Sequence, residues 1–236
     1  NIYGGFEETL NSYLDLPEFV SFYNSFTSLI SNAKEAEKQK LEKLYIALTF
    51  TRLQIAYYQH TGEYGFAIED GKRLIVKPEI NTYLKRLSIH KDFEDFASYI
   101  EVGGNLYQYM KNWNKLSEVA QKGNKLMDEE LTALSLLDKE YQQISVLNDG
   151  VIGFGEDYHQ GWLINSAKEL HIGFDCSNIN NAKTLSLRFL HNKKHQIFAP
   201  EQVIIYKDDI VYKVITEIKN NDPDNPDIKG IITDMD

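Results

Sequence analysis

The aromatic and histidine side chains between residues 158 and 195 are the groups in this chain best suited to binding a ligand. Sugar recognition needs an aromatic face beside planar hydrogen-bonding groups, and two short polar segments supply both. The candidate carbohydrate-binding residues are Tyr158, His159, Trp162, His191 and His195. Tyr158 and His159 are expected in an exposed loop, whereas the indole of Trp162 is expected to be buried.

Catalytic and metal chemistry have less support in the sequence. His191 and His195 are four residues apart, and this spacing binds zinc only on a helix or in a tight loop with a third ligand. Glu69, Asp70 and Asp92 could form an acid–base pair. However, they fall in loops or at helix starts, where carboxylates also stabilise the helix N-terminus. We therefore predict no catalytic residue. An enzyme with a carboxylate site between its helical and β parts is the alternative.

The composition narrows the possible partners. The chain has 236 residues, of which 42% are hydrophobic, and its formal net charge is −10. This charge argues against nucleic acid or an anionic membrane as the main partner. No apolar run approaches the ~18 residues that a membrane span needs. We expect a monomer with a glycan ligand, no nucleic acid partner and no membrane span.

The cysteine count and the two ends of the chain bear on its origin. The single cysteine, Cys176, excludes an internal disulfide. The chain begins at Asn1 without a methionine or a signal-like segment, and it finishes just after an apolar run. From these features we expect a piece of a larger protein.

Helical periodicity dominates residues 1–143. Asp15, Pro17 and Glu18 form a capping-box arrangement before a continuous apolar stripe that reaches Ala33. Further helices are predicted at 34–58 (with a stop at Gly62), 79–90, 92–100 and 106–120, with a short strand at 74–76 and an ambiguous stretch at 126–141. Arg52 lies in a mostly apolar helix, so we predict an ion pair with Glu or Asp, a ligand contact being the alternative. Together the helices predict an antiparallel bundle.

The pattern changes near Leu147, where Asn148-Asp149-Gly150 supplies turn chemistry. Strands are predicted around residues 170–174, 185–189, 203–206, 211–215 and 228–232, with an exposed polar loop at 220–226. Short strands at this spacing, with turns between them, are typical of an antiparallel β-sandwich. The predicted fold class is therefore α+β in separate domains: a helical bundle at 1–143 and a β-sandwich of the jelly-roll type, lacking its last strands, at 144–236.

Four motifs carry a resemblance to a known family. They are Leu147-Asn148-Asp149-Gly150; Gly161-Trp162-Leu163; His171-Ile172-Gly173-Phe174-Asp175; and Leu187-Arg188-Phe189-Leu190 followed, after a loop, by Ile197-Phe198-Ala199-Pro200-Glu201-Gln202-Val203. In combination they resemble the galactose-binding-like β-sandwiches of the discoidin or coagulation-factor C-terminal type. Cys176 is a departure, because leucine often follows the aspartate there.

The resemblance implies a ligand site and a metal site. Ligands of this family bind at loops on one end of the sandwich, and some members hold a structural calcium near the opening Asp-Gly turn. Asp149 maps onto that calcium position, and Glu156 and Asp157 are close enough in sequence to assist. No cofactor is required by the resemblance. The other interpretation is that Asp149 only caps its own turn.

The helical half resembles the all-α region that follows the barrel in bacterial glycoside-hydrolase-like proteins related to α-glucuronidases, a type familiar in Bacteroidetes. The resemblance implies a non-catalytic C-terminal region of a carbohydrate-processing protein. Its sandwich would bind carbohydrate or act as a spacer, and its location would be secreted, periplasmic or at the cell surface. A purely structural or protein-interaction module is a further alternative.

Overall fold

The computed structural model describes residues 14–89, 106–138, 143–155, 158 and 161–235. Helices and small antiparallel sheets are both present in these residues, so the fold class is mixed α+β. The chain separates into two compact units. The first takes its described residues from Asn1–Asp128, Ser145–Ile152 and Gly161–Leu163, and the second from Glu129–Ile144, Gly153–Gln160 and Ile164–Asp236. The division into domains at 1–143 and 144–236 stays a prediction.

The first unit begins with α2, Leu16–Asn32, and its start confirms the predicted capping box. The Asp15 carboxylate accepts a hydrogen bond from the Glu18 backbone N–H at 2.9 Å, and Pro17 lies in the first turn. This bond satisfies one of the backbone donors that a helix start leaves without a partner. The apolar stripe buries Val20, Tyr23 and Phe26, as the spacing predicted.

Helix α3, Glu35–Gln59, follows and packs against α2 and α4. It is exposed over most of its first turns and has most of its side chains buried from Tyr45 onward, as predicted from its sequence. The helix ends before the predicted stop at Gly62, because His60 caps it with a left-handed φ of 45° and donates its N–H to Tyr57 O.

The remaining elements of the first unit also match their patterns. Strands β1, Ala67–Glu69, and β2, Leu74–Val76, form an antiparallel hairpin that includes the strand predicted at 74–76. Helices α4, Pro78–Ile89, and α6, Leu106–Lys122, pack against each other and enclose a core with Trp113 and Leu116. The helix predicted at 92–100 lies outside the described residues.

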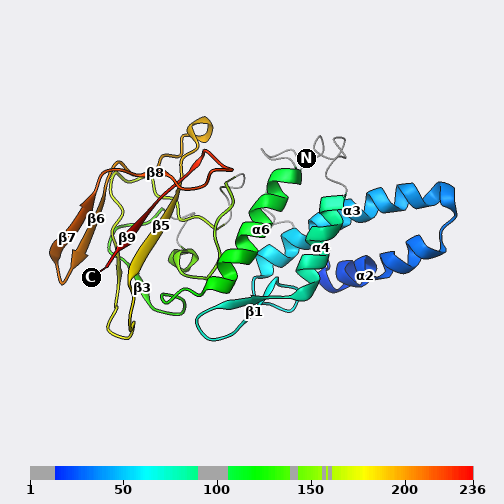
Figure 1. Ribbon diagram of the computed structural model, residues 1–236, viewed down its shortest axis with the longest axis horizontal. Coiled ribbons are helices and arrows are strands. Elements are labelled where there is room, and N and C mark those ends of the chain that lie inside the picture. The colour runs from blue at the N-terminus through cyan, green and yellow to red at the C-terminus, as the bar shows by residue number, and fades with distance from the viewer. Residues whose placement is uncertain (1–13, 90–105, 139–142, 156–157, 159–160, 236) are drawn as a thin grey trace. The chain divides into compact units, whose positions relative to one another are not determined.

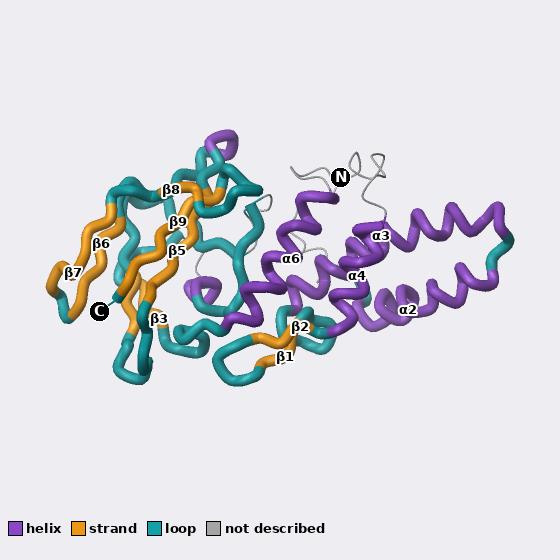
Figure 2. The backbone as a smooth tube through the Cα atoms, in the orientation of Figure 1, coloured by secondary structure: helices purple, strands orange, loops and turns teal. Residues whose placement is uncertain are grey.

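Short strands joined by long loops make up the second unit (Figure 2). Its strands are β3, Leu131–Ala133; β4, Ile172–Phe174; β5, Thr184–Leu190; β6, Val203–Lys207; β7, Ile210–Ile215; β8, Lys219–Asn220; and β9, Ile228–Asp234. All pairings are antiparallel: β3 with β4, β6 with β7, and β9 between β5 and β8 (Figure 1). The predicted strands are therefore present. Among the described residues, however, neither the packing of a β-sandwich nor that of a helical bundle is evident.

The loop predicted to be exposed at 220–226 is partly buried, and this corrects the prediction. Asp222 and Asn225 are both buried, although the loop is polar throughout. Arg188 on β5 supplies the physical reason, because its guanidinium lies 3.5 Å from the Asp222 carboxylate. Asp222 and Asn225 also accept hydrogen bonds from the backbone two residues later. A loop whose polar atoms all have partners can be buried at little cost.

Candidate functional site

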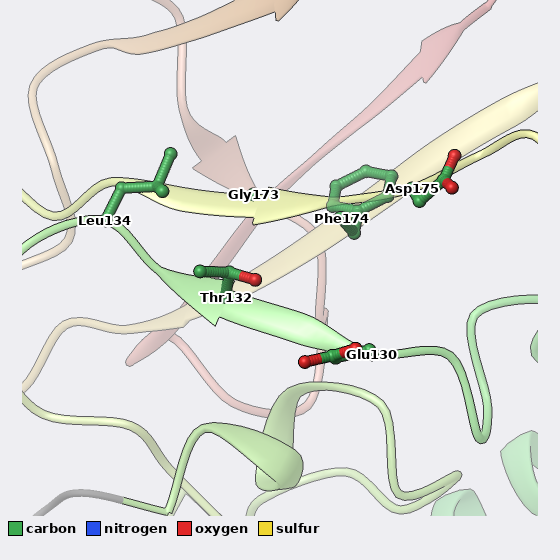
Figure 3. Close-up of a pocket in the computed structure, with 6 residues that line it drawn as sticks. All are labelled: Glu130, Thr132, Leu134, Gly173, Phe174 and Asp175. Atoms are coloured by element: carbon green, nitrogen blue, oxygen red, sulfur yellow. The ribbon is translucent and has the colours of Figure 1, made fainter.

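An open depression of about 350 Å³ lies over the strand pair β3–β4 in the second unit (Figure 3). Its lining residues are Glu130, Thr132, Leu134, Gly173, Phe174 and Asp175. Thr132 pairs with Gly173 in the antiparallel register. Because side chains alternate between the faces of a strand, Glu130, Thr132 and Leu134 share one face with Gly173 and Asp175. The depression is therefore built on one face of a two-stranded sheet.

The apolar part of the depression depends on a glycine. A Cβ added at Gly173 would lie 3.3 Å from Leu134 Cδ1, so the missing side chain leaves the floor open beside Leu134. Leu134 is 68% exposed and Phe174 is 38% exposed. Phe174 pairs with Leu131, so by the same alternation its side chain lies on the face opposite Thr132, and a ligand over Thr132 would cover Leu134.

Two carboxylates lie at the opposite end of the strand pair from Leu134 (Figure 3). Glu130 and Asp175 each adjoin the last paired residues, Leu131 and Phe174, and so lie across from each other. Asp175 accepts hydrogen bonds from the Ser177 N–H at 2.7 Å and from its hydroxyl at 2.9 Å. The backbone bond, followed by the hydroxyl bond, lowers the pKa of Asp175 below its usual value. Asp175 therefore keeps its negative charge near neutral pH.

Three of the five predicted sugar-binding residues take part in ring contacts in the second unit. The Tyr158 ring lies 4.8 Å from the His195 ring at an angle of 40°. His191 meets the ring of Phe198 edge to face at 5.8 Å. The turn Lys193–His195 (η2) between the two histidines is capped by Asn192, whose side chain accepts the His195 N–H. The structure thus brings Tyr158 and His195 together and gives His191 an aromatic partner.

The other two predicted residues are Trp162 and His159. Trp162 belongs to the first compact unit and is half-buried, and His159 lies outside the described residues. Sequence reasoning missed Phe198, which is 64% exposed, and the face formed by Glu130 and Thr132. The signal for that face was the alternation of residues 130, 132 and 134, which lay inside the stretch left ambiguous between helix and connector.

Asp149, the predicted calcium ligand, caps its own turn and lies near a histidine of the same unit. Its Oδ1 accepts the Val151 N–H at 2.9 Å, and its Oδ2 lies 3.8 Å from His60 Nδ1. Burial raises the pKa of Asp149 to about 7, against the opposing effect of the backbone hydrogen bonds. Burial also lowers the pKa of His60. The pair has the geometry of an ion pair, but the environment favours the neutral form of both groups.

The metal predictions are not decided by these contacts. Glu156 and Asp157 lie outside the described residues, so the calcium site stays a prediction. In the part of the chain that the structure describes, no group of three or more His, Cys, Asp or Glu residues could hold a metal ion. Within the same residues, no helix is both long enough and apolar enough to cross a membrane.

The predicted carboxylate partner of Arg52 is replaced by a carbonyl, which corrects the prediction. Arg52 is 4% exposed and donates from Nη1 to Tyr64 O at 2.7 Å. Its guanidinium also lies 5.5 Å from the centre of the Tyr83 ring. The loop after α3 folds back over the helix, so a main-chain carbonyl reaches the cation.

Comparisons with family models, with curated proteins and with solved structures found no match to this chain.

Proposed function

We propose that this chain is a non-catalytic, carbohydrate-binding region of a carbohydrate-processing protein, and that the sugar binds in the depression over β3 and β4. The observation that carries the proposal is the make-up of that depression. An exposed leucine adjoins a hydroxyl and two carboxylates on one face of the strand pair. A sugar ring presents apolar C–H groups beside hydroxyl groups, so it matches a surface that is apolar at one point and rich in acceptors at another.

The size of the depression agrees with a small ligand. Ligand pockets usually measure roughly 300–1,000 Å³, so 350 Å³ is at the lower end of that range. One or two sugar units fill such a volume. The rest of a longer glycan would extend into solvent, because the depression is open on a sheet face (Figure 3).

The charge of the depression favours some sugars over others. Among the residues that the structure describes, its lining contains Glu130 and Asp175 but no lysine or arginine. A uronic acid would therefore bring a third carboxylate next to two existing ones, which is unfavourable. The proposed ligand is a neutral sugar or an amino sugar, whose ammonium group would pair with the carboxylates.

The β-sandwich and the helical bundle predicted from the sequence belong to the same proposal. The strands of the second unit would form part of a galactose-binding-like sandwich, and the helices of the first would form an antiparallel bundle. The assignment rests on the sequence patterns and on the antiparallel pairing of strands at the predicted positions, β5 with β9 among them. The secreted, periplasmic or cell-surface location predicted from the resemblance is also part of the proposal.

The test is isothermal titration calorimetry of the whole chain with oligosaccharides of matched length that are neutral, amino-substituted or uronic. Leu134→Ala is expected to weaken binding about tenfold, since the apolar surface that it removes contributes about 1.5 kcal/mol when a ligand covers it. Glu130→Gln is expected to weaken binding of the amino sugar more than that of the neutral sugar.

A control variant at an exposed ring separates the two candidate places for the sugar. Phe198→Ala removes an exposed ring beside His191, and it should leave affinity unchanged if the sugar lies over β3–β4. Loss of binding on Phe198→Ala or Tyr158→Ala, with Leu134→Ala silent, would move the site to the loop predicted from the sequence. If no oligosaccharide binds the unaltered chain, the carbohydrate proposal is wrong.

A further inference from the structure

Two arginines and three tyrosines form one cluster where helices α2, α3 and α4 pack together in the first unit. Tyr23 belongs to α2, Tyr45 and Arg52 to α3, and Tyr83 and Arg86 to α4. The Tyr23 ring lies 5.2 Å from the Tyr45 ring and 5.4 Å from the Tyr83 ring. The five side chains therefore form a continuous network, and it lies in a different unit from the proposed sugar site.

Both guanidinium groups in this network are held by neutral partners. Arg86 Nη1 donates to Tyr23 Oη at 2.6 Å, and the guanidinium lies 4.0 Å from the centre of the Tyr45 ring. Arg52 is bonded to a main-chain carbonyl and lies over the Tyr83 ring, as described above. Among the residues that the structure describes, neither arginine forms an ion pair with an aspartate or a glutamate.

The tyrosine hydroxyls cannot supply the missing negative charge. Burial raises the pKa of Tyr23 above its usual value, and burial raises the pKa of Tyr83 as well. Both phenols are therefore neutral at physiological pH. Tyr23 also bonds to the Thr49 hydroxyl at 3.0 Å, so its oxygen is fixed in place between Thr49 and Arg86.

Two further facts indicate that this positive charge has a function. The Nε of Arg52 is buried without a hydrogen-bond partner. In addition, the chain contains 35 acidic and 25 basic residues, so carboxylates are abundant, yet none of those described pairs with either arginine. A buried cation normally takes an anionic partner, because an uncompensated charge in a low-dielectric site is costly. A bound anion would supply that partner.

We propose that the arginine–tyrosine cluster binds a phosphate group, with Arg86 as the residue that contacts it. Arg86 is half-buried and Arg52 is buried, so Arg86 is the more accessible of the two arginines, and Arg52 adds a second positive charge within the same network. A guanidinium group binds phosphate through two parallel N–H···O bonds. Two positive charges match the dianion of a phosphate group better than the single charge of a carboxylate.

The test is the melting temperature of the whole chain in inorganic phosphate, acetate or chloride at one ionic strength and pH. Phosphate at ten times its Kd is expected to raise Tm by roughly 3–6 °C, with acetate and chloride having little effect. Arg86→Gln should abolish the rise in Tm that phosphate causes. Arg86→Lys should reduce it, because lysine keeps the positive charge but lacks the two parallel N–H donors of a guanidinium group.

Arg73→Gln is the matched control, since Arg73 is an exposed arginine paired with Asp70 at 2.6 Å, and it should retain the full shift. Should Arg86→Gln fail to fold, labelling of the unaltered chain with phenylglyoxal replaces it. Phosphate is then expected to protect Arg86 and not Arg73, as read by mass spectrometry. The proposal is overturned if about 50 mM phosphate gives no Tm shift, if acetate stabilises equally, or if Arg86 is not protected.

Discussion

The buried carboxylate of Asp149 gives the most quantitative prediction. Its pKa is about 7 in the folded chain and 3.8 in the reference state. A group whose pKa is raised by folding stabilises the fold at low pH and loses that contribution as the pH rises through the folded value. A difference of about 3 pKa units corresponds to about 4 kcal/mol, and about 3 kcal/mol of this is lost between pH 5 and pH 8. The unaltered chain should therefore lose stability over this range through Asp149.

Asp149→Asn removes the ionisation and keeps the turn. The amide oxygen can still accept the Val151 N–H, and the side-chain shape is nearly unchanged. We expect the free energy of unfolding of Asp149→Asn to rise by about 2–3 kcal/mol relative to that of the unaltered chain from pH 5 to pH 8, so the variant becomes the more stable of the two. The lower bound allows for His60, which lies 3.8 Å away and could take up a proton when Asp149 ionises.

Urea unfolding followed by tryptophan fluorescence, at constant ionic strength from pH 5 to pH 8, measures this difference. His60 contributes in the opposite direction, because its lowered pKa costs stability as the pH falls, but both chains contain it. Asp208→Asn, at an exposed turn position with a φ of 52°, is the control and should show no pH-dependent change. If the difference in unfolding free energy between Asp149→Asn and the unaltered chain does not change with pH, Asp149 is solvated. A difference of the opposite sign would mean that the ionised pair with His60 is stabilising, and either result refutes the reasoning.

Three further predictions concern contacts that lie within one unit. Asp15→Ala removes the cap of α2 and should lower the free energy of unfolding by about 1 kcal/mol, whereas Asp15→Asn should restore most of it. Gly155→Ala should destabilise by about 1–3 kcal/mol, because the added Cβ would lie 2.0 Å from Asn225 Nδ2; the double variant with Asn225→Ala should recover part of the loss. Lys77→Met should cost about 1–2 kcal/mol, because Lys77 Nζ donates to Gly62 O at 3.1 Å and to Glu63 O at 3.0 Å; a smaller loss for Lys77→Arg in the same urea titration would support the charge-assisted bonds.

Features set by neighbours in the sequence could be predicted. The cap at Asp15 involves a residue three positions away, and the strands at 74–76 and 203–206 follow from alternation within one segment. These signals are local, so they survive without knowledge of the tertiary fold. The sheet partners were not predictable in this way, because β5 pairs with β9 although β6, β7 and β8 lie between them in the sequence.

Features set by residues that are distant in sequence could not be predicted. The polar sequence around Asp222 predicts an exposed loop, and the Arg188 guanidinium on β5, distant in sequence, contributes to its burial. The depression over β3 and β4 joins two segments that lie far apart in the chain, and its floor depends on the absence of a side chain at Gly173. The ring contact of Tyr158 with His195 likewise joins two separate loops, although both residue types were identified as candidates.

Several cations of the first unit bond to main-chain carbonyls, unlike Arg73, which pairs with Asp70, and these bonds explain why the prediction for Arg52 was wrong. Arg52 bonds to Tyr64 O, Lys77 to Gly62 O and Glu63 O, and Lys72 to Met127 O. In each case the charge meets a main-chain carbonyl of a loop, because such carbonyls lack the partners that a helix or sheet provides. A carbonyl satisfies a donor but carries no net charge, so each of these bonds fixes a loop without neutralising the cation. Arg86 likewise has a neutral partner, because it bonds to the Tyr23 hydroxyl. The cluster around Arg52 and Arg86 therefore keeps its positive charge inside an acidic protein, and that retained charge is the physical basis for expecting an anion there.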